Sequence, residues 1–139
     1  MTDNYFKVRT QRAEHIKDSI LKQVVNNGIN AKGRVDYNGS AILIEDEQWL
    51  IRMWIRLIWD DNLEGCTVCM SNIAFNESLQ RKGHFTSVIN KLKRTKYVDN
   101  ILIQSVSTPA MKNWCEKHRF KNVSRTIDWV WKAQNGLQA

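Results

Sequence analysis

The sequence predicts a mixed α/β (α+β) fold in which helices flank a mostly antiparallel central sheet. After one helical segment, the first half alternates apolar and polar residues with the period of strands. The second half holds two amphipathic helical stretches, each beside a strand-like run. With 139 residues, 42% of them hydrophobic and 25% charged, we expect one domain over residues 1–139. The small polar tail, residues 133–139, is expected to be flexible.

The first half is predicted to form a helix and then an antiparallel meander. Apolar residues in Gln11–Asn27 recur at helical spacing, and Gly28 supplies a stop. Asn38-Gly39 is the strongest hairpin signal in the chain. Strands are expected at Arg34–Tyr37, Ser40–Glu45, Gln48–Trp59 and Cys66–Phe75. The longest of them is predicted to bury one face, formed by Trp49, Ile51, Met53, Ile55, Leu57 and Trp59.

The second half changes to a helical period. An amphipathic helix is predicted from Lys82 to Thr95, and a strand from Asn100 to Val106. Pro109 suits the first turn of the next helix, where its missing N–H costs nothing, and Thr108 is its predicted N-cap. A short strand is expected over Phe120–Val123. A closing strand is expected over Arg125–Lys132, with one face formed by Ile127, Trp129 and Trp131.

The composition limits the classes of function. A formal net charge of +7 favours an anionic partner, which could be a phosphorylated cofactor, a nucleic acid or an acidic protein surface. No stretch approaches the ~20 consecutive apolar residues that span a bilayer. The N-terminus lacks the apolar segment of a secretory signal. We therefore expect a soluble, cytoplasmic protein that does not act on a membrane.

The three cysteines, Cys66, Cys69 and Cys115, show no spacing typical of a disulfide framework. Cys66 and Cys69 have the Cys-x-x-Cys spacing that zinc half-sites and redox motifs also use. In the predicted strand, however, positions three apart point to opposite faces. A zinc site also needs two further ligands at similar spacing, and none is evident. We therefore expect structural cysteines and no metal site.

The most informative segment runs from Ile73 to Phe85, where a strand ends, a polar turn follows and a helix begins. The first N–H groups of a helix have no intrahelical partner and, with the positive end of the macrodipole, form an anion site. Gly83 lets the backbone approach a phosphate closely, and Arg81 and Lys82 add positive charge. Local physics alone predicts a phosphate- or pyrophosphate-binding turn, and leaves open a plain turn with a solvated basic edge.

Gln80-Arg81-Lys82-Gly83-His84-Phe85, between a strand and an amphipathic helix, resembles the Gln/Arg-x-x-Gly-x-Gly/Ala motif of the GNAT superfamily of acyl-CoA-dependent N-acetyltransferases. Cys115-Glu116-Lys117-His118-Arg119-Phe120 is similar to that family's Tyr-Glu-Lys-x-Gly-Phe, and the order of elements fits as well. The resemblance implies a GNAT-like fold that binds acetyl-CoA and acetylates an amine. The cofactor-binding residues that it implies are Asn72, Ile73, Ala74, Phe75, Gln80, Arg81, Lys82, Gly83, His84, Phe85 and Thr86.

The sequence departs from the family pattern at three positions. Phe85 stands where the motif has glycine or alanine, and Arg119 replaces a glycine. Cys115 occupies the place of the tyrosine that can protonate the departing thiolate, so it is either a candidate acid or a small buried hydrophobic residue. Glu64 is the candidate carboxylate base. Asp60, Asp61 and Asp128 are open alternatives, and a solvated turn or surface carboxylate is the more common role for each of the four.

Residues Arg81 to Lys96 include six basic and no acidic residues. The basic helix end, Lys91–Lys96, either complements the helix dipole or forms a surface for a nucleic acid or an acidic protein. Two hypotheses follow. In the first, the protein is an acetyl-CoA-dependent N-acetyltransferase whose amine acceptor, a small molecule or a protein, the sequence does not define. In the second, it retains the fold without the chemistry and binds or inhibits an anionic partner.

Overall fold

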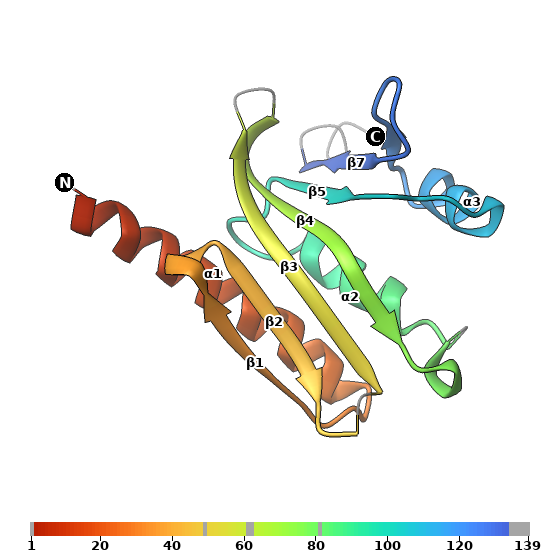
Figure 1. Ribbon diagram of the computed structural model, residues 1–139, viewed down its shortest axis with the longest axis horizontal. Coiled ribbons are helices and arrows are strands. Elements are labelled where there is room, and N and C mark those ends of the chain that lie inside the picture. Colours follow the sequence, from red (N-terminus) through yellow and green to blue (C-terminus); the bar gives the residue numbers. More distant parts are fainter. Residues whose placement is uncertain (1, 49, 61–62, 81, 134–139) are drawn as a thin grey trace.

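The computed structural model describes residues 2–48, 50–60, 63–80 and 82–133. A mixed sheet of seven strands, in the order β1-β2-β3-β4-β5-β7-β6, organises these residues (Figure 1). The strands are β1 (Ala31–Asp36), β2 (Ala41–Asp46), β3 (Ile51–Asp60), β4 (Leu63–Phe75), β5 (Asn100–Ile103), β6 (Lys121–Asn122) and β7 (Trp129–Lys132). The helices are α1 (Thr2–Asn26), α2 (His84–Lys93) and α3 (Pro109–Lys117), with 3-10 turns η1 (Tyr37–Gly39) and η2 (Glu77–Leu79). Every strand pair is antiparallel except β4 with β5, which confirms the predicted fold class.

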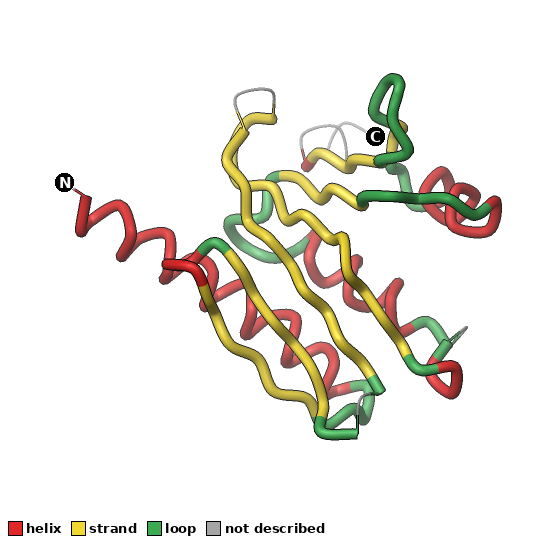
Figure 2. Tube along the Cα trace, in the orientation of Figure 1, coloured by secondary structure: helices red, strands yellow, loops and turns green. Residues whose placement is uncertain are grey.

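The buried face of the meander packs against α1, and α2 lies beside α1 on the same side of the sheet (Figure 2). α1 contributes apolar residues spaced three or four apart: Ala13, Ile16, Ile20 and Val24. Alternate positions of β2 and β3 oppose them, including Ile42, Ile44, Ile51, Met53, Ile55 and Leu57. Burying one such aliphatic side chain is worth about 1.5–3 kcal/mol. This contact therefore accounts for much of the stability of the first half.

A β-bulge interrupts β4 at Ser71. The partner of Trp54 is Asn72 while the partner of Ile55 is Met70, so Ser71 is the additional residue. The bulge changes which side chains face the core, from even-numbered positions up to Met70 to odd-numbered positions from Ile73 onward. Bulges also bend the strand that carries them. β4 consequently follows β3 to Phe75 but leaves its other neighbour, β5, after Met70.

The predicted elements are present, with corrected ends. α1 begins at Thr2 instead of Gln11, because no glycine or proline interrupts residues 1–27. β5 ends at Ile103, before the predicted Val106. The N–H of Ser105 bonds to the carboxylate of Asp128 at 3.0 Å, outside the strand ladder.

The closing strand is also shorter than predicted, because β7 begins at Trp129. Ile127 precedes it in a turn, where Thr126 N donates to Val123 O at 3.0 Å. Ile127 is 53% exposed, and its predicted place in the closing strand is wrong. Trp129 and Trp131 lie in the strand as predicted, and both are buried. The predicted Thr108 cap is confirmed, since its hydroxyl accepts the N–H of Met111 at 3.2 Å.

Two of the predicted features fall on residues that the structure does not describe. Trp49, predicted on the buried face, and the predicted flexible tail beyond Ala133 lie outside the described residues. Among the helices that are described, none combines the length and the hydrophobicity needed to cross a bilayer.

Asn38 and Gly39 form the first hairpin, as predicted, within the loop that joins Asp36 to Ala41. Gly39 has a φ of 87°, and a Cβ there would lie 2.9 Å from the backbone of Thr10 in α1. Gly28 also has a φ of 87°, but a Cβ there would meet no atom within 4 Å. At Gly28 only the left-handed backbone conformation favours glycine. At Gly39 the close approach of α1 favours it as well.

We expect Gly28→Ala to lower the free energy of unfolding by about 1–2 kcal/mol, the cost of a left-handed alanine. Gly39→Ala should lower it by about 3 kcal/mol or more, because the clash with Thr10 adds to that cost. Urea unfolding of both variants measures the difference. Equal losses would show that the approach of α1 to the hairpin does not require a glycine.

Candidate functional site

A cavity of about 550 Å³ opens where β4 and β5 separate. The last paired residues are Met70 and Ile103, followed by one hydrogen bond of 3.1 Å from Gln104 N to Met70 O. One wall of the cavity comes from β4 between Met70 and Phe75, and another from residues 103–108. The segment from Leu79 to Thr86 and two residues of α3 complete the lining. In this stretch the edge of β4 that faces β5 has no strand partner among the described residues.

The predicted loop and the start of α2 form one end of the cavity. Gly83, with a φ of 81°, is the N-cap residue of α2, and a Cβ there would meet no atom within 4 Å. No side chain caps the helix, and its first backbone acceptor, Gly83 O, bonds to Ser87 N at 2.9 Å. The preceding amides of α2 therefore have no intrahelical acceptor. Gln80 Nε2 donates to Phe75 O at 2.9 Å, which holds the loop against the end of β4.

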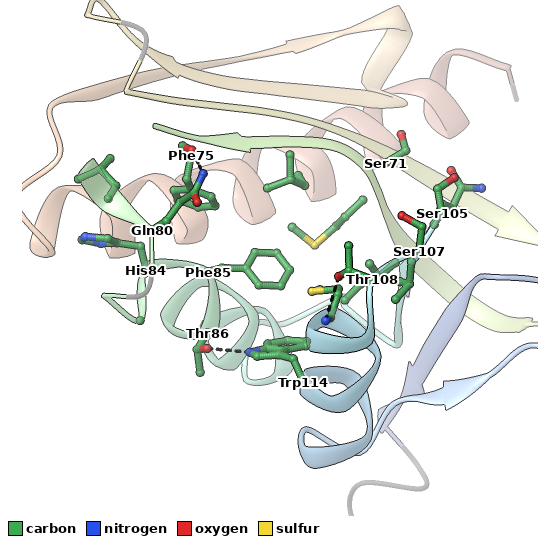
Figure 3. Close-up of a pocket in the computed structure, with 18 residues that line it drawn as sticks. Ser71, Phe75, Gln80, His84, Phe85, Thr86, Ser105, Ser107, Thr108 and Trp114 are labelled. Carbon is green, nitrogen blue, oxygen red and sulfur yellow. Dashed lines mark hydrogen bonds between the residues drawn. The ribbon is translucent and has the colours of Figure 1, made fainter. Parts of the chain in front are cut away.

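Aromatic side chains form the middle of the cavity (Figure 3). Phe85 points into the cavity between the two ends, with its ring centroid 6.4 Å from that of Phe75 and 4.9 Å from that of Trp114. Trp114 Nε1 donates to Thr86 Oγ1 at 2.9 Å, which joins α3 to the first turn of α2. Trp114 also stacks on His118, at 4.2 Å between centroids. The large residue in the motif therefore packs α2 against α3 and also narrows the cavity.

Hydroxyl groups gather at the other end, near the separation of the strands. Figure 3 shows Ser71, Ser105 and Ser107 there, opposite Gln80 and His84. Ser71 is the bulge residue, and Ser105 has a left-handed φ of 60°. This group was not predicted from the sequence. Its detectable signal is the apolar pattern of β4, which shifts by one position between Met70 and Ile73.

The structure brings most of the predicted cofactor residues together. The lining includes Ile73, Phe75, Gln80, Gly83, His84, Phe85 and Thr86. Lys82 is exposed beside the loop, and Ala74 lines a separate shallow cleft on the open face of the sheet. Arg81 and Asp61 lie outside the described residues. For Asn72, Glu64 and Asp60 only the backbone is described, and Glu64 lies at the opposite end of β4 from the cavity.

Cys115, the candidate acid, lies in the hydrophobic core. Its side chain is fully buried and does not line the cavity. Burial, followed by the nearby Glu116 carboxylate, raises the pKa of the Cys115 thiol to about 11. Burial likewise raises the pKa of Cys66 to about 12. Of the two roles that the sequence left open for Cys115, its position favours that of a small buried hydrophobic residue.

The charged groups around the site are few. His84 is the single ionisable side chain among the described residues that line the cavity. No group of three or more His, Cys, Asp or Glu in the described part of the chain could hold a metal ion. The three cysteines are free and buried.

The comparisons with known proteins identify the fold. The chain matches no family model, and a search of curated proteins finds no match. Among solved structures, the NatC complex bound to Gag peptide and CoA is 13% identical with a TM-score of 0.50. That match covers 86% of this chain and 91% of the other. The AtaT–AtaR complex bound to DNA is 10% identical with a TM-score of 0.51, and the match covers 70% and 71% of the two chains.

A third solved structure, a GNAT-family protein from Desulfovibrio desulfuricans, is 13% identical with a TM-score of 0.48, over 67% of each chain. At these identities the likeness concerns the fold alone. The chain has a GNAT-like fold, as the sequence predicted.

The buried thiols make the stability of the fold dependent on pH. A thiol whose pKa is raised by folding keeps its proton longer in the folded than in the unfolded state. Its contribution is therefore complete below the unfolded pKa and is lost as the pH rises through the folded pKa. For Cys115 these limits are 9.0 and about 11. We expect the free energy of unfolding to fall over this interval, and to fall less steeply in Cys115→Ala.

Urea unfolding at several pH values between 8 and 11 would measure both slopes, with the variant as the control for lysine and tyrosine titration. Parallel slopes for the two proteins would contradict the burial of this thiol.

Proposed function

We propose that this protein is an acyl-CoA-dependent N-acetyltransferase that binds acetyl-CoA in the cavity between β4 and β5. The observation that carries the proposal is the position of the α2 N-terminus at one end of that cavity. The amides of His84, Phe85 and Thr86 offer donors to an anion, and the helix dipole favours negative charge there. Gly83 leaves open space at this point, and the exposed Lys82 adds a positive charge.

The rest of the cavity suits the remainder of this cofactor. The unpartnered edge of β4, from Ser71 to Phe75, offers backbone groups to a pantetheine amide. Apolar side chains, among them Met70 and Ile73, surround that path. When bound, acetyl-CoA supplies the acetyl group as a thioester. The Ser71, Ser105 and Ser107 hydroxyls at that end would orient its carbonyl by hydrogen bonds. The NatC complex, which has a similar fold, was solved with CoA.

A second candidate is a GNAT-fold protein without catalytic activity that binds an anionic partner. The scarcity of ionisable groups in the cavity favours this candidate, because His84 is the single one among the described lining residues. Cys115 is buried in the core, and Phe85 narrows the cavity. Among the described side chains, no carboxylate therefore lines the cavity, and His84 is the one titratable group there. We rank this candidate second because the helix terminus and the open strand edge are both retained.

Calorimetric titration with acetyl-CoA tests the proposed cofactor site. We expect the wild type to bind with a Kd on the order of micromolar. In Gly83→Glu a carboxylate would enter the anion site, so binding should weaken at least about tenfold. Gly28→Glu is the matched control, because Gly28 also has a left-handed φ and open space but does not line the cavity. It should bind like the wild type.

The outcomes separate the two candidates. No binding by the wild type, or an equal loss in both variants, would refute the cofactor site. Binding without release of CoA in the presence of any of a panel of primary amines would favour the inactive candidate. Acetylated product, detected by mass spectrometry, would support the enzyme.

A further inference from the structure

Two cationic side chains lie over one aromatic ring, away from the cavity. Tyr97 lies in the connection from α2 to β5, with the guanidinium of Arg12 5.1 Å and the ammonium of Lys96 5.0 Å from its ring centroid. The ring of His15 meets it edge-on at 5.5 Å. Arg94 is exposed at the C-cap of α2, three residues before Tyr97. We call Arg12, His15, Arg94, Lys96 and Tyr97 the Tyr97 cluster.

The packing of α1 against α2 creates this cluster. At the start of α2, Ser87 is hydrogen-bonded to Gln23 and, at 3.0 Å, to Asn27 near the end of α1. At the other end of α2, Tyr97 meets Arg12 and His15 from the middle of α1. The two helices therefore run antiparallel, and residues more than 80 positions apart in the sequence come together.

Among the described side chains, no acid forms an ion pair with a cation of the cluster. The nearest carboxylates on α1, Glu14 and Asp18, both bind Lys17, at 2.6 and 3.2 Å. Asp99 accepts the N–H of Cys66 at 2.8 Å. In the described chain, no ion pair is found for Arg12, Arg94 or Lys96.

Unlike Arg94 and Lys96, Lys93 at the end of α2 is held by contacts within the protein. Its ammonium donates to His118 O at 2.6 Å and lies over the rings of Phe120 and Trp131. Burial, followed by the charge of Arg119, lowers its pKa. Lys93 is thus part of the contact between α2 and α3, and the predicted basic surface at Lys91–Lys96 does not include it. The exposed charge lies instead with Arg94 and Lys96, and the half-buried Arg12 of α1 adds to it.

We propose that the Tyr97 cluster binds the phosphate backbone of a nucleic acid. Its cations, which form no ion pair with a described side chain, suit a polyanion. An acidic protein surface would need apolar or aromatic anchors for a stable interface. The exposed large hydrophobic residues among the described side chains, Val8, Val25, Tyr37 and Ile127, lie outside the cluster. Two cations already flank the Tyr97 ring, so the cluster recognises charge and not sequence.

This inference does not depend on the proposed acetyltransferase activity, because no residue of the cluster lines the cavity. The net charge of +7 favours an anionic partner whether the protein is an enzyme or an inactive binding protein. Nucleic-acid binding and cofactor binding are therefore separable by mutation.

The test uses fluorescence anisotropy with two labelled mixed-sequence probes, a 20-base-pair DNA duplex and a 20-nucleotide single strand, between about 50 and 200 mM salt. We expect the wild type to bind at least one probe. The triple variant Arg12→Gln, Arg94→Gln, Lys96→Gln should bind at least about tenfold more weakly at low salt. Its slope of log K against log salt should be shallower by about 2–3, which corresponds to three lost phosphate contacts.

The control variant Lys112→Gln, Lys117→Gln, Lys121→Gln removes the same charge from exposed positions of α3 and β6. It should keep the wild-type slope. Tyr97→Gly removes the ring without changing charge, at a φ of 75° that glycine adopts readily, and should also weaken binding. Acetyl-CoA titration and circular dichroism of each variant check the cavity and the fold.

Three results would overturn the proposal. The first is no binding of either probe by the wild type. The second is an equal loss in the control variant, which would mean that net charge alone is responsible. The third is displacement of the probe by polyglutamate as effectively as by unlabelled nucleic acid, which would identify an acidic protein as the occupant.

Discussion

The backbone pairing between β4 and β5 determines how the rest of this structure is arranged. The two strands remain paired only from Thr67–Asn100 to Met70–Ile103. The bulge at Ser71 then bends β4 along β3. After β5, the N–H of Ser105 donates a hydrogen bond to the carboxylate of Asp128 and not to a strand. Neither strand can restore the ladder beyond this point. The space between them is the cavity, and the backbone edge left without a partner is its main polar surface.

Packing between α2 and α3 then sets the shape of that space. Phe85 and Trp114 are in contact across it, and the Trp114 indole is hydrogen-bonded to Thr86. In a GNAT-like loop with a small residue at position 85, this contact would be absent. Phe85 thus fills part of the cavity and at the same time joins the two helices.

The basic side chains of the protein have different surroundings and different roles. Lys93 is half-buried against Phe120 and Trp131 and stabilises the junction of α2 with α3. Lys17 forms ion pairs with two acids of α1. Arg12 and Lys96 instead share the ring of Tyr97 and form no ion pair with a described acid. The net charge of the chain is therefore the sum of two kinds of cation. Some, like Lys93 and Lys17, stabilise the fold, and others, like Arg12 and Lys96, can attract an anion.

The features that could be predicted from the sequence are those that depend on a few adjacent residues. These include the order of elements, the Asn38-Gly39 turn, the Thr108 cap and the glycine at the start of α2, because local backbone preferences and periodicity encode them. Only the tertiary structure decided that Cys115 is buried, that Ser105 lies in the cavity and that Arg12 meets Tyr97. Each of these depends on residues distant in sequence, whose contacts exist only once the helices pack on the sheet.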